Sequence, residues 1–169
     1  MRKIKQIVPR GVLKQLFYAF IYSKFTYAIT CYGSAYLNQL QRLKSLIKRA
    51  LKLVLNRSSI TPEICKNERI FDYDMAYEYF TCINMYRILC LNSHSFLANK
   101  VLSYQTNHPH ETRSVLNQEL TLPFTRLNKC QKSFLYKGIN FWNELPPRIR
   151  NVHEDLNSFK KQLKEHLLT

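Results

Sequence analysis

Residues 36–56, YLNQLQRLKSLIKRALKLVLN, hold the pattern that decides how this chain is organised. Their apolar side chains recur at steps of three and four, which places them on one face of a helix. The members of this apolar set are Leu40, Leu43, Ile47, Ala50, Leu51 and Val54. The pattern therefore predicts one long amphipathic helix that packs by this face.

The remaining face of this helix carries charges of one sign only. Its basic residues are Arg42, Lys44, Lys48, Arg49 and Lys52, with Arg57 just beyond the predicted end. Like charges one turn apart repel by about 0.2–0.5 kcal/mol per pair, and no Asp or Glu offsets that repulsion here. Because an anionic partner would relieve it, these six residues are the predicted nucleic-acid-binding set.

The charge of the whole chain is distributed unevenly. Its net charge is +15 at pH 7 and its pI is about 9.8. Residues 1–62 contain twelve Lys and Arg residues and no acid, whereas all eleven acids and the other fourteen bases come later. Such asymmetry favours nucleic acid as the partner, ahead of an anionic membrane surface. A basic face without a specific partner is the third interpretation.

The sequence contains none of several common catalytic and ligand-binding motifs. With three glycines, the chain has no glycine-rich phosphate cradle and no G-x-S-x-G turn. No catalytic residue and no cofactor is predicted. No metal is predicted either, because His108 and His110 have no evident third ligand beside them. The five cysteines show no C-x-x-C spacing and are expected to be buried free thiols of an intracellular protein, nuclear or cytoplasmic. No apolar run approaches the roughly 20 residues of a membrane span, so no membrane partner is expected.

Helix-start and helix-stop signals divide the rest of the chain. Before residue 36, an apolar face from Val12 to Ile21 predicts a helix, and Ser23 is a candidate cap for a second one. Thr61-Pro62-Glu63 is typical of a helix start. The further predicted elements are a helix over residues 72–91 capped by Asp72 or Asp74, a short helix over 96–102, a loop over 104–118, a short edge strand over 120–122, one helix or a strand and a helix over 133–145, and a last helix capped by Asp155 or Asn157.

These elements together predict a mainly α fold in three parts. A basic helical bundle occupies residues 1–58, and a helical continuation occupies residues 59–104. A loop-rich C-terminal segment follows over residues 105–169, with one or two short strands and terminal helices. In that segment Trp142 is expected to lie in the core rather than to stack on a base.

Two blocks of the sequence resemble the C-terminal part, the thumb and the region after it, of reverse transcriptases from LINE-type (non-LTR) retrotransposons. The first block consists of Leu16-Phe17-Tyr18, Ile21-Tyr22, Tyr27, Tyr32-Gly33 and Lys48-Arg49-Ala50. The second and more specific block consists of Thr112-Arg113-Ser114, Pro123, Arg126, Asn128, Ser133, Tyr136, Gly138, Trp142-Asn143-x-Leu145-Pro146, Phe159-Lys160, Leu163-Lys164 and Leu167-Leu168. The chain departs from the family's commoner residues at Ser23, Tyr32, Ile47 and Leu127.

The resemblance implies a thumb-like bundle that grips a template–primer duplex. In this family the palm with its paired catalytic aspartates precedes the thumb, so the resemblance implies descent from a polymerase without polymerase activity. The expected function is a non-catalytic, sequence-independent contact with RNA, DNA or an RNA–DNA duplex through phosphates. Tyr36, Asn38 and Gln39 are candidates for sugar or phosphate hydrogen bonds, and Arg113 and Arg126 either bridge the loop to the body or touch nucleic acid.

Two alternatives stand beside this expectation. The chain could be a protein-interaction or self-associating helical module, because in the family an apolar surface of the thumb faces the palm. That surface would include Leu16, Phe17, Phe20 and Tyr22. The other alternative is a decayed, truncated reading frame of a transposable element with no selected function.

Overall fold

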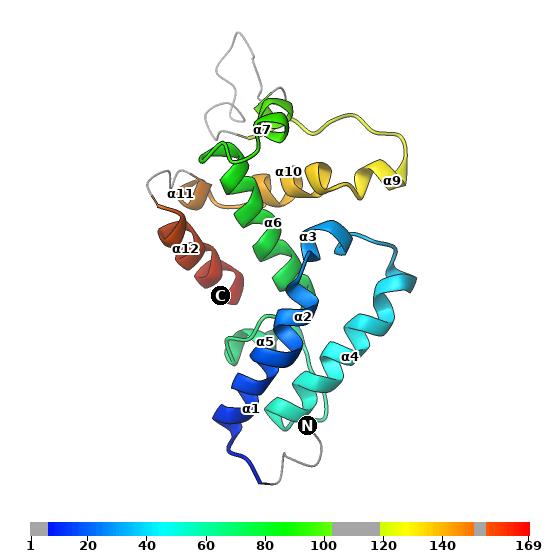
Figure 1. Cartoon of the computed structure of the whole chain (residues 1–169), viewed down its shortest axis with the longest axis vertical. Coiled ribbons are helices and arrows are strands. Elements are labelled where there is room, and N and C mark those ends of the chain that lie inside the picture. The colour runs from blue at the N-terminus through cyan, green and yellow to red at the C-terminus, as the bar shows by residue number, and fades with distance from the viewer. Residues whose placement is uncertain (1–6, 103–118, 151–154) are drawn as a thin grey trace. The chain divides into compact units, whose positions relative to one another are not determined.

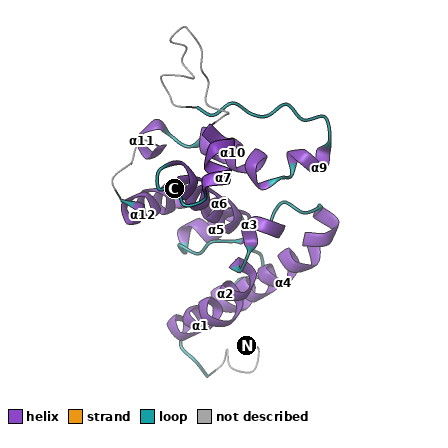
Figure 2. Ribbon diagram, turned by 45° about the horizontal axis from the view of Figure 1, so that its top comes forward, coloured by secondary structure: helices purple, strands orange, loops and turns teal. Residues whose placement is uncertain are grey.

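A computed structural model describes residues 7–102, 119–150 and 155–169 of the chain. These residues are mainly helical, which confirms the predicted fold class (Figures 1 and 2). The described residues form two compact units, divided between Tyr77 and Glu78. That division falls inside a helix, whereas the sequence suggested breaks after residues 58 and 104.

The first unit begins with a helical run in three parts. Helix α1 (Arg10–Phe17) continues without a break into the π-helical turn η1 (Tyr18–Tyr22) and then into α2 (Ser23–Thr26). Ser23 is therefore not the cap that the sequence suggested. Its hydroxyl donates instead to the Ala19 carbonyl one turn back, at 2.5 Å, as serine does inside helices.

The predicted amphipathic helix is α4 (Leu37–Leu55), which follows the short helix α3 (Ile29–Tyr32). It ends at Asn56, whose left-handed backbone turns the chain, and the Arg57 amide donates to the Lys52 carbonyl at 3.2 Å. The predicted apolar face is buried except for Leu43, which is partly exposed. This face packs against α1, so the helical period of residues 36–56 was read correctly (Figure 1).

Capping residues set the next two helices. Helix α5 (Pro62–Asn67) begins where predicted, with the Thr61 hydroxyl accepting a hydrogen bond from the Ile64 amide at 3.4 Å. Helix α6 (Tyr73–Leu89) is capped by Asp72, which accepts from the Met75 amide at 2.9 Å. The carboxylate of Asp74, the other candidate cap, pairs instead with Lys44.

Among the described residues, the second unit contains most of α6 and the helices that follow it. These are α7 (Ser95–Leu102), α9 (Asn128–Gln131), α10 (Phe134–Glu144), α11 (Pro147–Arg150) and α12 (Leu156–Leu168). Ser133 caps α10, so the stretch is one helix rather than a strand and a helix. Asp155 caps α12 through the amides of Asn157 and Ser158.

Stacked aromatic rings form the centre of the second unit. The Phe159 ring lies 4.4 Å from the Tyr86 ring and 5.9 Å from the Trp142 ring, centroid to centroid. Trp142 is 4% exposed and is a core residue, as expected. Gly138 lets α10 approach α6 closely, because a Cβ at this position would lie 2.7 Å from the sulfur of Met85.

The predicted edge strand at residues 120–122 does not form, and the described residues contain no strand longer than an isolated bridge at Leu120. The side-chain amide of Asn143 bonds both backbone groups of Leu120. Its Oδ1 accepts from the Leu120 amide at 2.9 Å, and its Nδ2 donates to the Leu120 carbonyl at 2.8 Å. This double hydrogen bond satisfies the backbone of a buried residue.

Two further expectations concern the cysteines and the polar loop. All five cysteines are free thiols, but only Cys65 and Cys82 are buried, whereas Cys31 and Cys130 are exposed. Burial raises the pKa of the Cys65 thiol to about 11, against the opposing charge of Lys48. The predicted loop over residues 104–118, with His108, His110 and Arg113, lies outside the described residues.

Candidate nucleic-acid interface

The exposed side of α4 carries most of the predicted basic set. Arg42, Lys48, Arg49 and Lys52 are exposed, and so is Arg57 after the helix. At 3.6 residues per turn, the four helical members fall within about 120° of the helix circumference. They therefore form one ridge, which we call the α4 ridge and define as Arg42, Lys48, Arg49, Lys52 and Arg57.

Lys44, the sixth member of the predicted set, lies in a different environment. It is partly buried beside the apolar face of α4, and its ammonium pairs with the Asp74 carboxylate of α6. The same ammonium lies 5.0 Å from the centre of the Tyr73 ring. Because its charge is already met by a carboxylate and an aromatic face, Lys44 is the weakest candidate of the six for a phosphate contact.

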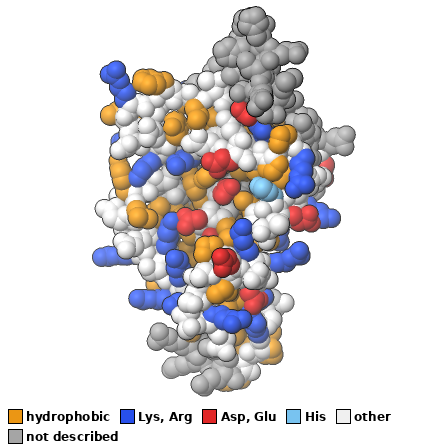
Figure 3. All heavy atoms as spheres, turned by 180° about the vertical axis from the view of Figure 1, so that it is seen from behind, with side chains coloured by type: hydrophobic (Ala, Val, Ile, Leu, Met, Phe, Trp, Pro, Cys, Tyr) orange, Lys and Arg blue, Asp and Glu red, His pale blue; other side chains and the backbone are white. Residues whose placement is uncertain are grey.

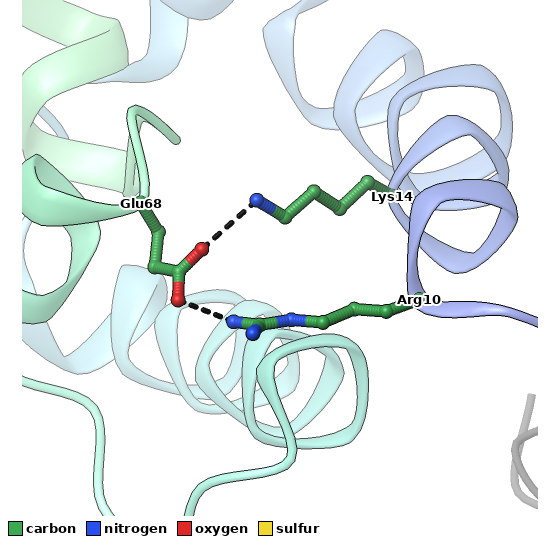
Figure 4. Close-up of polar contacts among 3 residues, drawn as sticks. All are labelled: Arg10, Lys14 and Glu68. Atoms are coloured by element: carbon green, nitrogen blue, oxygen red, sulfur yellow. Dashed lines mark hydrogen bonds and ion pairs between the residues drawn. The ribbon is translucent and has the colours of Figure 1, made fainter.

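A second carboxylate neutralises the basic residues of α1. Glu68 accepts from the Lys14 ammonium at 2.9 Å with one oxygen and pairs with the Arg10 guanidinium through the other (Figure 4). The hydrogen bond from Lys14, followed by that from Arg10, lowers the pKa of Glu68 below its ordinary value. Glu68 and Asp74 together therefore hold three cations of the first unit.

The ion pairs of Glu68 should make the stability of the protein depend on pH. Because its pKa is lower in the folded than in the unfolded protein, its stabilising contribution is complete above the unfolded pKa of about 4.3 and is lost as the pH falls through the folded pKa. We expect Glu68→Gln to lower the free energy of unfolding by about 1 kcal/mol at pH 7, since Arg10 is half exposed and solvent screens part of the attraction. Urea unfolding of both proteins from pH 7 to pH 3 should show this difference shrinking below about pH 4. A difference that stays constant across that range would contradict the assignment.

The α4 ridge has no such partner within the described residues of the first unit, where no carboxylate lies in ion-pair range of its five members. Elsewhere the two signs mix: acidic side chains lie among basic ones over the middle of the face seen in Figure 3. Exposed cations elsewhere, such as Arg126 and Lys129, also have no described carboxylate partner, so the ridge is distinguished by the gathering of five such cations on and just after one helix.

A shallow hollow of about 500 Å³ lies along the same side of α4. Its described lining is Asn38, Gln41, Arg42, Ser45, Leu46 and Arg49. Besides the two arginines, the lining includes the amides of Asn38 and Gln41 and the hydroxyl of Ser45, and groups of this kind commonly bond phosphate and sugar oxygens. Asn38, a predicted candidate, lies in this hollow, whereas Gln39 is exposed outside it and Tyr36 is 51% exposed.

The spacing of the ridge suits a polyanion. Arg42 and Lys52 are about 15 Å apart along the helix axis at 1.5 Å per residue. That length corresponds to four or five base pairs of a duplex at about 3.4 Å each. One helix can therefore place several cations along successive phosphates without bending.

The sequence predicted the basic residues of the ridge but not the ion pairs of nearby cations with Glu68 and Asp74. Lys44 and Asp74 are 30 residues apart, and Arg10 and Glu68 are 58 apart, so no local pattern connects them. The only sequence signal is that the first acids of the chain follow directly after the basic third.

None of the helices in the described part is both long enough and apolar enough to span a membrane. Within the same residues, no three His, Cys, Asp or Glu side chains gather in a way that could hold a metal ion.

Comparisons of this chain with protein-family models, with curated proteins and with solved structures found no match.

Proposed function

We propose that this chain binds nucleic acid through its phosphates, without reading base sequence, by means of the α4 ridge. The observation that carries the proposal is the exposure of five cations on and just after one helix, with no described carboxylate paired to them. The ligand is RNA, DNA or an RNA–DNA duplex, all of which present rows of phosphates to a helix.

Electrostatics supports this ligand class. Lys48 and Lys52 repel one another across one helical turn, and polyphosphate relieves that repulsion while releasing condensed counterions. Contacts of this kind fix the position of a duplex and carry no sequence information. The proposed role is therefore to hold nucleic acid rather than to select a site on it.

The resemblance of the quoted blocks to LINE-type reverse transcriptases supports a specific version of this role. In that version the chain derives from the thumb and following region of such an enzyme and acts without catalysis. The α4 ridge then corresponds to the surface that lies against a template–primer duplex. Lys48 and Arg49 belong both to the ridge and to the first block of resemblance.

The salt dependence of binding tests the proposal. If the five ridge cations each neutralise a phosphate, the logarithm of the association constant should fall with the logarithm of the salt concentration at a slope of about −4 to −5. Fluorescence anisotropy with a labelled duplex, titrated at several salt concentrations, measures this slope. A slope near zero, or no binding at low salt, would remove the proposal.

The exposed apolar residues of the first unit favour one other candidate function, self-association. Phe20 in η1 is 68% exposed and Tyr27 is 80% exposed. Of the four residues expected to form an uncovered surface, Phe17 is fully buried and Leu16 and Tyr22 are only partly exposed. Light scattering that shows concentration-dependent assembly, unchanged by salt, would favour this candidate over the first.

A further inference from the structure

The second unit contains another stretch without acids. Between Glu119 and Glu144 the sequence has no Asp or Glu and contains the cations Arg126, Lys129, Lys132 and Lys137. Arg126 and Lys129 are exposed. The stretch resembles the N-terminal third in charge, yet it shares no residue with the α4 ridge.

An aromatic ring stands at the start of this stretch. Phe124 is 89% exposed, the highest value among the exposed large apolar side chains of the described residues. A phenylalanine held this far out of the core gains little from folding. In the sequence, Arg126 follows it by two residues and Lys129 by five.

Local contacts hold the segment in place. The Thr125 carbonyl accepts from the side-chain amide of Gln131 at 3.2 Å, and the Thr125 hydroxyl is buried. Phe124 and Arg126, on either side of Thr125, are both exposed, whereas Thr125 is partly buried. The Gln131 contact also ties the segment to α9, which carries Lys129.

We propose that Phe124, Arg126 and Lys129 form a binding site for single-stranded nucleic acid. The Phe124 ring stacks on one unpaired base, and the two cations contact the phosphates on either side of it. Stacking of this kind tolerates any base because every base has a π-face. Bases inside a duplex already stack on their neighbours, so the site discriminates single strands from duplexes.

An anionic membrane is the other surface that a ring flanked by cations can meet. Binding to a membrane strengthens with the apolar area that is inserted, and this requires several apolar side chains on one side. The other large apolar side chains of this segment are Leu122, which is 39% exposed, and Leu127, which is 66% exposed. Neither has an aromatic ring, so Phe124 is the one side chain of the three with the π-face that base stacking uses. Together with the charges of Arg126 and Lys129, this ring favours a single strand over a bilayer.

The test compares two probes on the full chain, a labelled oligouridine and a labelled duplex of matched length. Phe124→Ala should weaken oligouridine binding about tenfold, as loss of one stacked base does, and leave duplex binding within about twofold. Phe124→Tyr keeps an aromatic face and should bind oligouridine within about twofold of the parent. Phe96→Ala removes a phenylalanine that is 75% exposed on α7 and should change neither affinity.

Three results would overturn the proposal. The first is that oligouridine does not bind, or that Phe124→Ala changes its affinity less than twofold. The second is an equal loss on the duplex. The third is that Phe124→Ala abolishes binding to phosphatidylserine vesicles while oligouridine binding is unchanged. This test is independent of the test of the α4 ridge. If the α4 ridge does not bind phosphates, duplex binding will show no salt dependence. The effect of Phe124→Ala on oligouridine affinity can still be measured in that case.

Discussion

Replacing Gly33 with alanine should lower the free energy of unfolding by about 3 kcal/mol or more, the upper part of the range for overpacking a core. A Cβ at this position would lie 2.1 Å from Cδ2 of Tyr77 and 2.4 Å from the Ile29 carbonyl oxygen. Both distances are below van der Waals contact, and the Tyr77 ring is itself buried. The expected loss is large beside the 5–15 kcal/mol that stabilises a typical domain.

The surroundings of Gly33 leave little room for relaxation. Its amide donates to the Ile29 carbonyl at 2.7 Å, and its carbonyl accepts from the buried Tyr73 hydroxyl at 3.4 Å. Moving the Gly33 backbone away from Tyr77 would strain both hydrogen bonds. The backbone angles are ordinary helical ones, so the requirement for glycine here comes from close approach and not from conformation.

Gly11 provides the matched control. It lies in α1, where an added Cβ would meet nothing within 4 Å. Gly11→Ala should therefore raise stability slightly, by at most about 1 kcal/mol, because alanine loses less backbone entropy in a helix. Urea unfolding followed by circular dichroism measures both variants. Equal effects of the two substitutions would show that the packing around Gly33 is not as described.

Features that depend on neighbours along the chain could be predicted from the sequence. The period of residues 36–56 gave α4 and its buried face, and Thr61-Pro62 gave the start of α5. For two helices the sequence left two candidate N-caps each, Asp72 or Asp74 and Asp155 or Asn157. In the structure the caps are Asp72 and Asp155. All of these depend on interactions within about one helical turn, where sequence spacing and spatial distance coincide.

Features that depend on distant residues could not be predicted in this way. Leu120 alternates with polar residues as a strand does, but Asn143, 23 residues away, satisfies its backbone instead. In η1 the π-helical turn shifts the following side chains around the axis, so Phe17 is buried while Phe20 is 68% exposed. A regular 3.6-residue period had placed both on one face. The pairing of Lys44 with Asp74 is a third case, and it changes the composition of the candidate site.

Neutralising the α4 ridge should weaken duplex binding about a thousandfold near 0.1 M salt. A variant with Arg42→Gln, Lys48→Gln, Arg49→Gln and Lys52→Gln leaves Arg57 as the last ridge cation. Each phosphate contact contributes about −0.9 to the salt slope, so losing four should bring the slope from between −4 and −5 to about −1. The fold should tolerate the change, since glutamine and lysine have similar helix propensities and the repulsion along α4 is removed.

Lys44→Gln is the control that separates this effect from general loss of charge. It removes a cation from the same helix, but one that already pairs with Asp74. We expect its salt slope on the duplex to match that of the parent, while stability falls by up to about 1 kcal/mol because the ion pair and the contact with the Tyr73 ring are lost. If Lys44→Gln lowers the slope by a full contact, Lys44 exchanges Asp74 for phosphate on binding and belongs to the interface. If the fourfold variant binds the duplex as tightly as the parent, the unneutralised charge of α4 serves another purpose and the proposed function fails.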